Sequence, residues 1–336
     1  LRNGRNQAVL VMGPLEADTT LIKNLEIAIS DFPARLVIDV IELSERIAFA
    51  SDMGHSSAKG IFSMSLNKDD IFSITSQNER IIQGSPVWSP GMEWIFFDYK
   101  DLDQWDLNRR IFMVHPDGSN LTQVTDSGLW SENPSVSPSG NEIIYSCYNR
   151  LPPDDDNDKN ICLKDIYGGE ERVLVRGDGY YWTGTEYQEY YPGGFYDKQL
   201  YRPTFSPDGD EIVFFARHPV KYGRWNLLSM EFDPTTLTPK SSPQILGWLF
   251  DGDTISNSCE FVYLSECVPQ FTPDAENLLC FLEFLRRPPK AGQPCDFTQG
   301  FTKISFWGIA RIRLQELKNA PNAYIANYID KIYDTQ

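Results

Sequence analysis

Residues 203–215 read Pro-Thr-Phe-Ser-Pro-Asp-Gly-Asp-Glu-Ile-Val-Phe-Phe, and this stretch decides the fold. Its Ser-Pro-Asp-Gly segment favours a type I turn, with Ser in the first place, Pro fixing φ in the second and Gly in the fourth. The strand that follows, at 212–215, is apolar at four consecutive positions. Such a run is typical of a strand buried on both faces, as between stacked sheets. The stretch therefore predicts an antiparallel strand pair inside a layered β structure.

The same pattern recurs at residues 86–97, 134–145 and 269–281. Each copy has a Pro, an apolar residue, Ser or Thr, a second Pro, a short turn and an apolar strand. In the last copy Ala275 stands where Gly209 stands at 203–215, so we expect that turn to differ in shape, because Ala lacks the conformational freedom of Gly. A second predicted hairpin follows each copy, which makes four strands per repeat and is typical of a propeller blade.

The repeats predict an all-β fold, with residues 1–336 forming a single β-propeller of four-stranded antiparallel blades. Six blades are favoured, with seven as the alternative because the intervals between copies are uneven. A first unit lacks the Ser-Pro turn, and a sixth blade would combine a strand at 8–12 with the stretch 324–333, which would close the ring. The five recognisable blades span about 41–78, 85–126, 133–176, 200–247 and 266–315.

Two stretches resemble the repeats of TolB-type propellers, which are relatives of WD-repeat blades. They are the strand pair at 203–215 and the run Pro-Asp-Gly-Ser-Asn-Leu-Thr-Gln-Val-Thr at 116–125. The resemblance implies a bacterial protein that works in the periplasm or elsewhere outside the cytoplasm. TolB itself has a sizeable α/β domain before its propeller, whereas only residues 1–40 precede the first unit here. Similar blades occur beside the hydrolase domain of prolyl-oligopeptidase-like peptidases, and as haem-free subunits of periplasmic redox complexes such as hydrazine synthase.

Composition and motifs exclude several functions. The net charge of −17 argues against a nucleic-acid partner, because phosphate binding needs a basic surface. The sequence has no apolar run long enough to span a membrane as a helix. It also has no G-x-S-x-G elbow, no P-loop and no dinucleotide fingerprint. We therefore predict no catalytic residues and no resident cofactor, apart from a calcium ion at one acidic segment.

That acidic segment, residues 152–160, alternates carboxylates at Asp154, Asp156 and Asp158. Alternating oxygen ligands resemble a calcium-binding loop. Lys159 occupies the place where an EF-hand has Gly, so a solvated hairpin loop is the competing interpretation.

A second unusual segment, residues 177–201, is rich in aromatic residues and lies between two predicted blades. We predict a long loop at one rim that docks a partner protein, because Tyr and Trp give large contact areas at low entropic cost. The alternatives are that it caps the propeller's own core or that its rings stack on sugars. The predicted partner-binding residues are Tyr180, Tyr181, Trp182, Tyr187, Tyr190, Tyr191, Phe195 and Tyr196.

The six cysteines fall into near pairs. Cys147 and Cys162 flank a loop between two predicted strands, so we expect them to form a disulfide. Weaker pairings are Cys259 with Cys267 and Cys280 with Cys295. A disulfide would indicate an oxidising compartment.

The predicted function is thus a non-catalytic scaffold or interaction subunit of a larger periplasmic complex, such as a multi-haem redox enzyme. The alternative is a propeller with a hydrolase, carbohydrate-binding or small-ligand site at its central channel.

Overall fold

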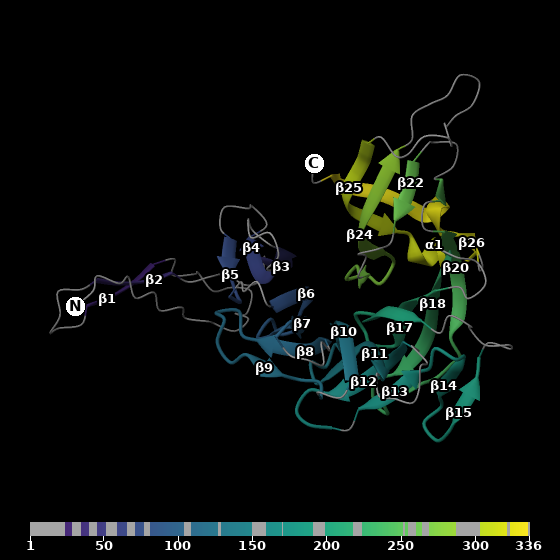
Figure 1. Cartoon of the computed structure of the whole chain (residues 1–336), viewed down its shortest axis with the longest axis horizontal. Coiled ribbons are helices and arrows are strands. Elements are labelled where there is room, and N and C mark those ends of the chain that lie inside the picture. Colours follow the sequence, from purple (N-terminus) through teal and green to yellow (C-terminus); the bar gives the residue numbers. More distant parts are fainter. Residues whose placement is uncertain are drawn as a thin grey trace.

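Five β-sheets form the body of the chain in the computed structural model, and Figure 1 shows them following one another along an arc. The structure describes residues 24–28, 35–39, 46–51, 59–65, 71–76, 81–103, 109–126, 129–149, 159–169, 171–190, 199–217, 224–250, 253–254, 260–263, 269–286, 303–320 and 323–334. A separate antiparallel pair, β1 (Asn24–Ala28) and β2 (Arg35–Asp39), precedes the first sheet.

The first three sheets follow the chain order. The first contains β3 (Arg46–Ser51), β4 (Gly60–Ser65) and β5 (Ile71–Ser73). The second contains β6 (Ile81–Trp88), β7 (Ile95–Asp101), β8 (Arg109–Val114) and β9 (Thr122–Gln123). The third contains β10 (Leu129–Val136), β11 (Glu142–Asn149), β12 (Asn160–Asp165), β13 (Arg172–Val175), β14 (Tyr180–Trp182) and β15 (Tyr187–Glu189).

The last two sheets also take strands from the C-terminal stretch. The fourth contains β16 (Leu200–Phe205), β17 (Glu211–Arg217), β18 (Arg224–Asp233), β19 (Thr238–Pro239), β20 (Gln244–Phe250) and β26 (Ala323–Tyr324). The fifth contains β21 (Asp253–Thr254), β22 (Glu260–Tyr263), β23 (Gln270–Phe271), β24 (Leu278–Arg286), β25 (Lys303–Ile312) and β27 (Ile329–Asp334). Two short helices, α1 (Leu314–Lys318) and the 3-10 helix η2 (Ile325–Tyr328), separate β25, β26 and β27.

The Ser-Pro turns form as predicted and join the first two strands of a blade. In the fourth sheet Gly209 N donates to Ser206 O at 2.9 Å, and the Ser206 hydroxyl accepts from Glu211 N at 3.0 Å. Ala275 makes the same turn: its N donates to Thr272 O at 2.9 Å, and its φ is +58°. The expectation that this turn would differ in shape is therefore wrong, since the surrounding hydrogen bonds hold Ala in the left-handed conformation.

Burial on both faces of the second strands is confirmed. Residues 212–216 of β17 are all at most 1% exposed. Their side chains alternate between two neighbours: Val213 and Phe215 pack toward the fifth sheet and α1, whereas Ile212 and Phe214 pack toward the third sheet. The core is thus a series of apolar layers between adjacent sheets, as a propeller requires. The described part of the chain includes no helix long and apolar enough to cross a membrane.

The structure shows five blades, not six or seven, and the four-stranded prediction holds only for the second sheet. The long intervals between repeats form extra strands within blades, such as β14 and β15, rather than extra blades. The prediction that residues 324–333 help to form a sixth, closing blade is wrong. Those residues add to existing sheets instead, because β26 pairs with β20 and β27 pairs with β25. Leu314 and Leu317 of α1 are fully buried in the core between the fourth and fifth sheets, so the chain doubles back along those blades. Residues 8–12 lie outside the described residues.

Candidate functional site

Three residues in left-handed backbone conformation mark the first strands of consecutive blades. They are Ser85 (φ 48°), Asn133 (φ 56°) and Arg202 (φ 55°), and each directly precedes the first Pro of the repeated motif. Each lies within a break in the register of its strand pair. A left-handed residue other than Gly costs about 1–2 kcal/mol, and a following Pro restricts it further. Strain of this kind clusters at functional sites, so this region is the candidate site.

The three strained residues are tied across blades. Asn133 Nδ2 donates to Ser85 Oγ at 2.8 Å, and Arg202 N donates to Ser146 Oγ at 2.9 Å. The first strands of the second and third blades are therefore joined, and the first strand of the fourth blade contacts the second strand of the third. We call the end of the blades that carries the Ser-Pro turns the turn rim. The opposite end, where β10 and β16 begin, is the start rim.

A network of charged side chains lies near the start rim, on β7, β8, β10 and the residue before β12. Arg109 pairs with Asp98, and Arg109 Nε also lies 3.8 Å from a carboxylate oxygen of Glu132. Lys159 Nζ donates to the other carboxylate oxygen of Glu132 at 2.5 Å. These four residues form the mouth cluster, and their side chains are between 1% and 25% exposed. Buried charges are rare unless they are paired, and here two cations share Glu132.

Electrostatics within the mouth cluster follow from this geometry. Burial raises the pKa of Asp98 despite the opposing charge of Arg109. Burial would also raise the pKa of Glu132, but the charge of Lys159, together with hydrogen bonds from Lys159 and Trp130, holds that pKa below its usual value. Burial is likewise the largest influence on Lys159 and lowers its pKa, and the charges of Arg202 and Arg109 lower it further.

Aromatic rings border the mouth cluster. The rings of Trp130 and Tyr148 are stacked, with centroids 5.1 Å apart, and Trp130 Nε1 donates to Glu132 at 3.0 Å. Lys159 Nζ lies 4.2 Å from the centroid of Tyr201 and 5.4 Å from that of Tyr148. Cation–π contacts of this kind stabilise a cation in a partly desolvated place. The arrangement can bind a charged group.

The aromatic segment predicted as a loop is instead the hairpin β14–β15 at the outer edge of the third sheet (Figure 1). Its rings divide into two groups. Tyr181 and Tyr190 pack against the core between the third and fourth sheets, as the capping alternative expected. Tyr180 and Tyr187 remain 37% exposed. The rings of Trp182 and Tyr187 are tilted against each other, with centroids 5.2 Å apart. The other predicted partner-binding residues, Tyr191, Phe195 and Tyr196, lie outside the described residues.

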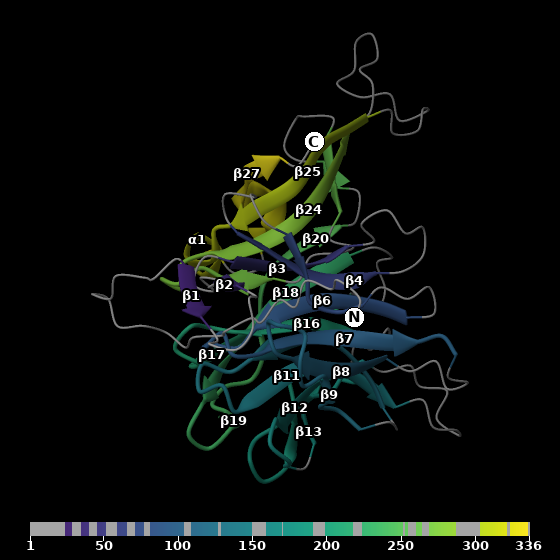
Figure 2. The same cartoon turned by 90° about the vertical axis from the view of Figure 1, so that its left-hand side faces the viewer.

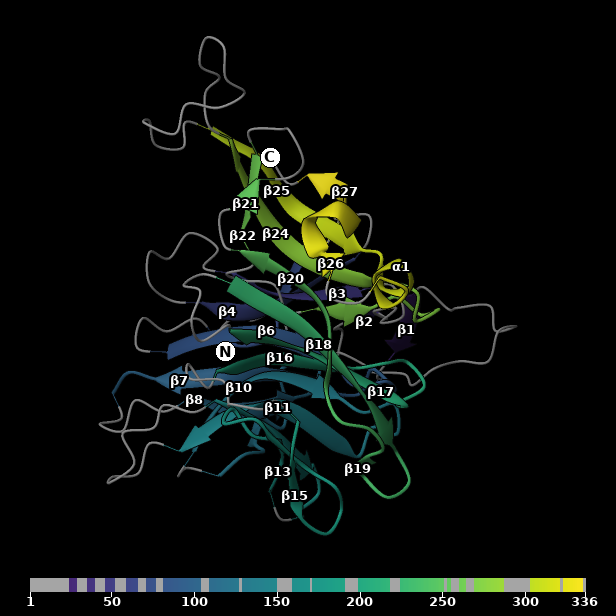
Figure 3. The ribbon, with the colours of Figure 1, turned by 90° about the vertical axis from the view of Figure 1, so that its right-hand side faces the viewer.

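Figures 2 and 3 show the molecule from its two sides, and in Figure 3 β15 lies at the opposite end of the molecule from β25 and β27. The tip of the hairpin reaches the next blade, because Gly184 and Thr238 lie close together and Arg172 Nη1 donates to Leu237 O at 3.4 Å. The hairpin therefore contacts the next blade, and β15 is the last strand of its sheet in the described part of the chain.

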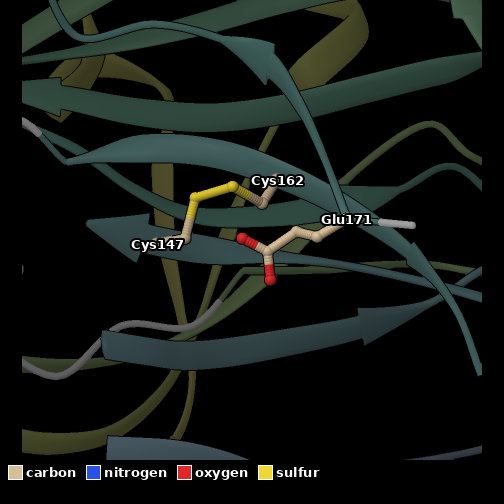
Figure 4. A group of neighbouring side chains, drawn as sticks. All are labelled: Cys147, Cys162 and Glu171. Atoms are coloured by element: carbon tan, nitrogen blue, oxygen red, sulfur yellow. A yellow bond between two sulfur atoms is a disulfide. The ribbon is translucent and has the colours of Figure 1, made fainter. Parts of the chain in front are cut away.

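The predicted disulfide between Cys147 and Cys162 is present, with the two Cα atoms 5.9 Å apart (Figure 4). Glu171 lies beside it, and within the described ranges this trio is the group with metal-ligand spacing. Its two sulfur atoms are bonded to each other and thus do not coordinate a metal. Cys280 is also disulfide-bonded. The candidate calcium ligands Asp154, Asp156 and Asp158 lie outside the described residues, as do Cys259, Cys267 and Cys295, so the calcium site stays a prediction.

Sequence reasoning missed the mouth cluster, because Asp98, Arg109 and Glu132 are far apart along the chain and belong to no motif. One signal was available. The residue before the first Pro varies in type, yet Ser85, Asn133 and Arg202 occupy the same place in the second, third and fourth blades. Comparing Ser85, Asn133 and Arg202 in that register would have pointed to the site.

No family model matches the chain. A curated relative, an uncharacterized protein of Agrobacterium fabrum, is 28% identical over 167 residues, which cover 46% of this chain and 50% of that protein. The chain thus spans about half the length of the curated relative it matches. Similar solved structures include TolB from Acinetobacter baumannii (14% identity, 74% of this chain and 62% of that chain, TM-score 0.39). Another is an oligogalacturonate lyase in complex with manganese (18% identity, 69% and 55%, TM-score 0.38). The repeated Ser-Pro turns and the stacked sheets confirm the β-propeller fold that the TolB-type repeats implied.

Proposed function

We propose that this chain is a non-catalytic propeller that works outside the cytoplasm and docks a partner protein on the hairpin β14–β15. The observation that carries the proposal is the edge strand β15. All three of its residues are exposed, and β15 ends its sheet in the described part of the chain. An edge strand presents backbone N–H and C=O groups to which an extended segment of another protein can add.

The side chains beside this edge suit an interface. The guanidinium of Arg176 lies 5.6 Å from the ring centroid of Tyr180 and 5.4 Å from that of Tyr187. Tyr187 is held rigidly, because its hydroxyl donates to Val173 O at 2.9 Å. Tyr and Arg are the residue types that contribute most to binding energy at interfaces, and rigid side chains lose little entropy on binding.

The disulfide supports the proposed compartment. Cys147 and Cys162 are both buried, and disulfides of this structural kind persist in oxidising environments. A partner in the periplasm or another extracytoplasmic space is therefore part of the proposal, and subunits of a larger complex, including a redox complex, are the partners we favour.

To test the proposal, a photo-crosslinking amino acid replaces the exposed residue Gln188 in a tagged version of the chain. Complexes are then purified from the extracytoplasmic fraction of the source organism. We expect one stoichiometric complex by native mass spectrometry, with cross-links at 188. The double variant Arg176→Ala/Tyr180→Ser should lose the complex. Leu121→Ser should retain it, because Leu121 is 51% exposed on the second sheet, away from the hairpin. Equal loss in both variants, or turnover of a substrate by the isolated chain, would contradict the proposal.

A further inference from the structure

A cleft of about 610 Å³ opens between the fourth and fifth blades at the turn rim, a volume typical of small-molecule sites. Its lining comes from the Ser-Pro turns of both blades, from β18 and the start of β20, and from α1. The helix α1 borders both this cleft and the apolar layer, because its leucines are buried while Gln315 and Lys318 line the cleft. The charged lining residues are Asp208, Asp210, Glu211, Glu231, Lys240 and Lys318.

The register of the fourth sheet places two carboxylates of this lining directly opposite each other. Glu211 of β17 pairs with Glu231 of β18, and residues opposite each other in an antiparallel pair share a face. Val213, two residues along β17, packs toward the fifth sheet and α1, so both glutamates belong to the face that borders the cleft. Like charges in directly opposite positions destabilise a sheet, and this chain nevertheless has such a pair.

Lys318 of α1 neutralises one member of the pair. Its Nζ donates to a carboxylate oxygen of Glu211 at 2.7 Å, and the two side chains are only 28% and 17% exposed. Glu231 is exposed, and within the described residues its carboxylate makes no hydrogen bond or ion pair. The cleft therefore holds an uncompensated negative charge beside one that α1 already neutralises.

Two further side chains of the lining have open charges. Asp208 is not one of them, because its Oδ1 accepts from the Ser206 hydroxyl at 2.5 Å and from Asp210 N at 3.2 Å. The Asp210 carboxylate and the Lys240 ammonium are both exposed and form no hydrogen bond or ion pair in the described part of the chain. Together with Glu231 they present two carboxylates and one ammonium, so a complementary ligand carries two cationic groups and one anionic group.

We propose that this cleft binds a free amino acid with a cationic side chain, such as lysine or arginine. Asp210 and Glu231 receive its two cationic groups, and Lys240 receives its carboxylate. A metal cation would leave Lys240 unmatched and would be repelled by it. The lining includes no aromatic ring on which a sugar could stack. The site is separate from the mouth cluster and from the docking edge β15.

The test titrates L-lysine and L-arginine into the full chain by calorimetry at constant ionic strength. Each is compared with the amine that lacks its carboxylate, diaminopentane for lysine and agmatine for arginine, and glutarate serves as a ligand without amines. We expect one site for at least one amino acid, about tenfold weaker binding of its amine and no binding of glutarate. Lys240→Met should weaken the amino acid about tenfold without weakening the amine, because only the amino acid offers Lys240 a carboxylate.

Glu231→Gln separates a binding role from a structural one. It should weaken binding about tenfold and yet raise the melting temperature of the free chain, because it removes the repulsion with Glu211. A lower melting temperature would show that Glu231 is structural and would overturn its role as a ligand-binding residue. Glu93→Gln is the matched control, since Glu93 is an exposed carboxylate in the turn between β6 and β7 of the second blade. This control should leave binding unchanged.

Three results would overturn the site: absence of heat with both amino acids, an amine that binds as tightly as its amino acid, or equal weakening in Glu93→Gln. The second result would show that the carboxylate is not recognised, and the third would indicate general screening of charge. Gln188, Arg176 and Tyr180, on which the docking test depends, do not line this cleft. Failure here therefore leaves the docking proposal standing.

Discussion

Asn133 donates a hydrogen bond from Nδ2 to Oγ of Ser85, 2.8 Å away, and both residues have left-handed backbones directly before a proline. The bond joins the first strands of the second and third blades at the same place in the repeat. It shows that the blades are coupled through their strained residues as well as through apolar layers.

Replacing Asn133 tests this coupling. Asn tolerates the left-handed region better than a β-branched residue does, so Asn133→Val should lower the free energy of unfolding by about 2–3 kcal/mol, from added strain and the lost hydrogen bond. Asn133→Gly should change it by less than about 1 kcal/mol, because relief of strain offsets the lost bond. Urea unfolding followed by tryptophan fluorescence measures both. An equal loss in the two variants would show that the backbone conformation there is not strained.

The fourth place of the Ser-Pro turn offers a matched pair of substitutions. Ala275 has φ +58° and Gly209 has φ +79°. Ala275→Gly should stabilise the protein by up to about 1 kcal/mol, since Gly adopts this conformation without strain. Gly209→Ala should destabilise it by on the order of 1–2 kcal/mol, because the backbone becomes strained and the new Cβ would lie 3.3 Å from Cδ of Pro138. Thermal unfolding by calorimetry checks both signs, and a stabilising Gly209→Ala would contradict the interpretation.

The disulfide should contribute strongly to stability. Cys147 and Cys162 are separated by 15 residues and join the adjacent strands β11 and β12 inside the third blade. Constraining a loop of that length in the unfolded state is worth about 3 kcal/mol. The double variant Cys147→Ala/Cys162→Ala should lose roughly that amount in denaturant unfolding. Adding a reductant to the double variant should then have less effect than adding it to the parent chain.

Glu132 should make stability depend on acid pH. Its pKa in the folded protein lies below its unfolded value, so its stabilising contribution is full above the unfolded pKa and is lost as the pH falls through the folded pKa. Glu132→Gln should remove this part of the acid dependence. It should also cost about 3–5 kcal/mol at neutral pH, because Lys159 and Arg109 lose their shared carboxylate.

Urea unfolding at a series of pH values compares the parent with Glu132→Gln, and the difference includes a change at Asp98, because the charge of Glu132 helps to raise the pKa of Asp98. The raised pKa of Asp98 acts in the opposite direction, since a group with a raised folded pKa stabilises the protein at low pH and loses that contribution as the pH rises. Identical pH profiles for the two proteins would contradict the role of Glu132.

The sequence by itself determined the local structure of this protein. The Ser-Pro turns, the doubly buried strands after them and the disulfide were all predicted, because turn chemistry and apolar runs act over a few residues. The blade repeat followed from the recurrence of these local signals. The expected shape of the Ala275 turn was wrong because the hydrogen bonds around it outweighed the local preference of one residue.

Only the tertiary structure decided how many blades form and where the site lies. The segment after residue 176 adds β14 and β15 to the third blade because Tyr181 and Tyr190 find a core to bury against, which no local pattern reveals. The C-terminal stretch joins two existing sheets because α1 buries its leucines between them. Glu132 meets Arg109 and Lys159 because strands from different parts of the chain meet at one rim. Contacts between distant residues depend on the packing of whole sheets, and that packing is set by buried area summed over the fold rather than by any single motif.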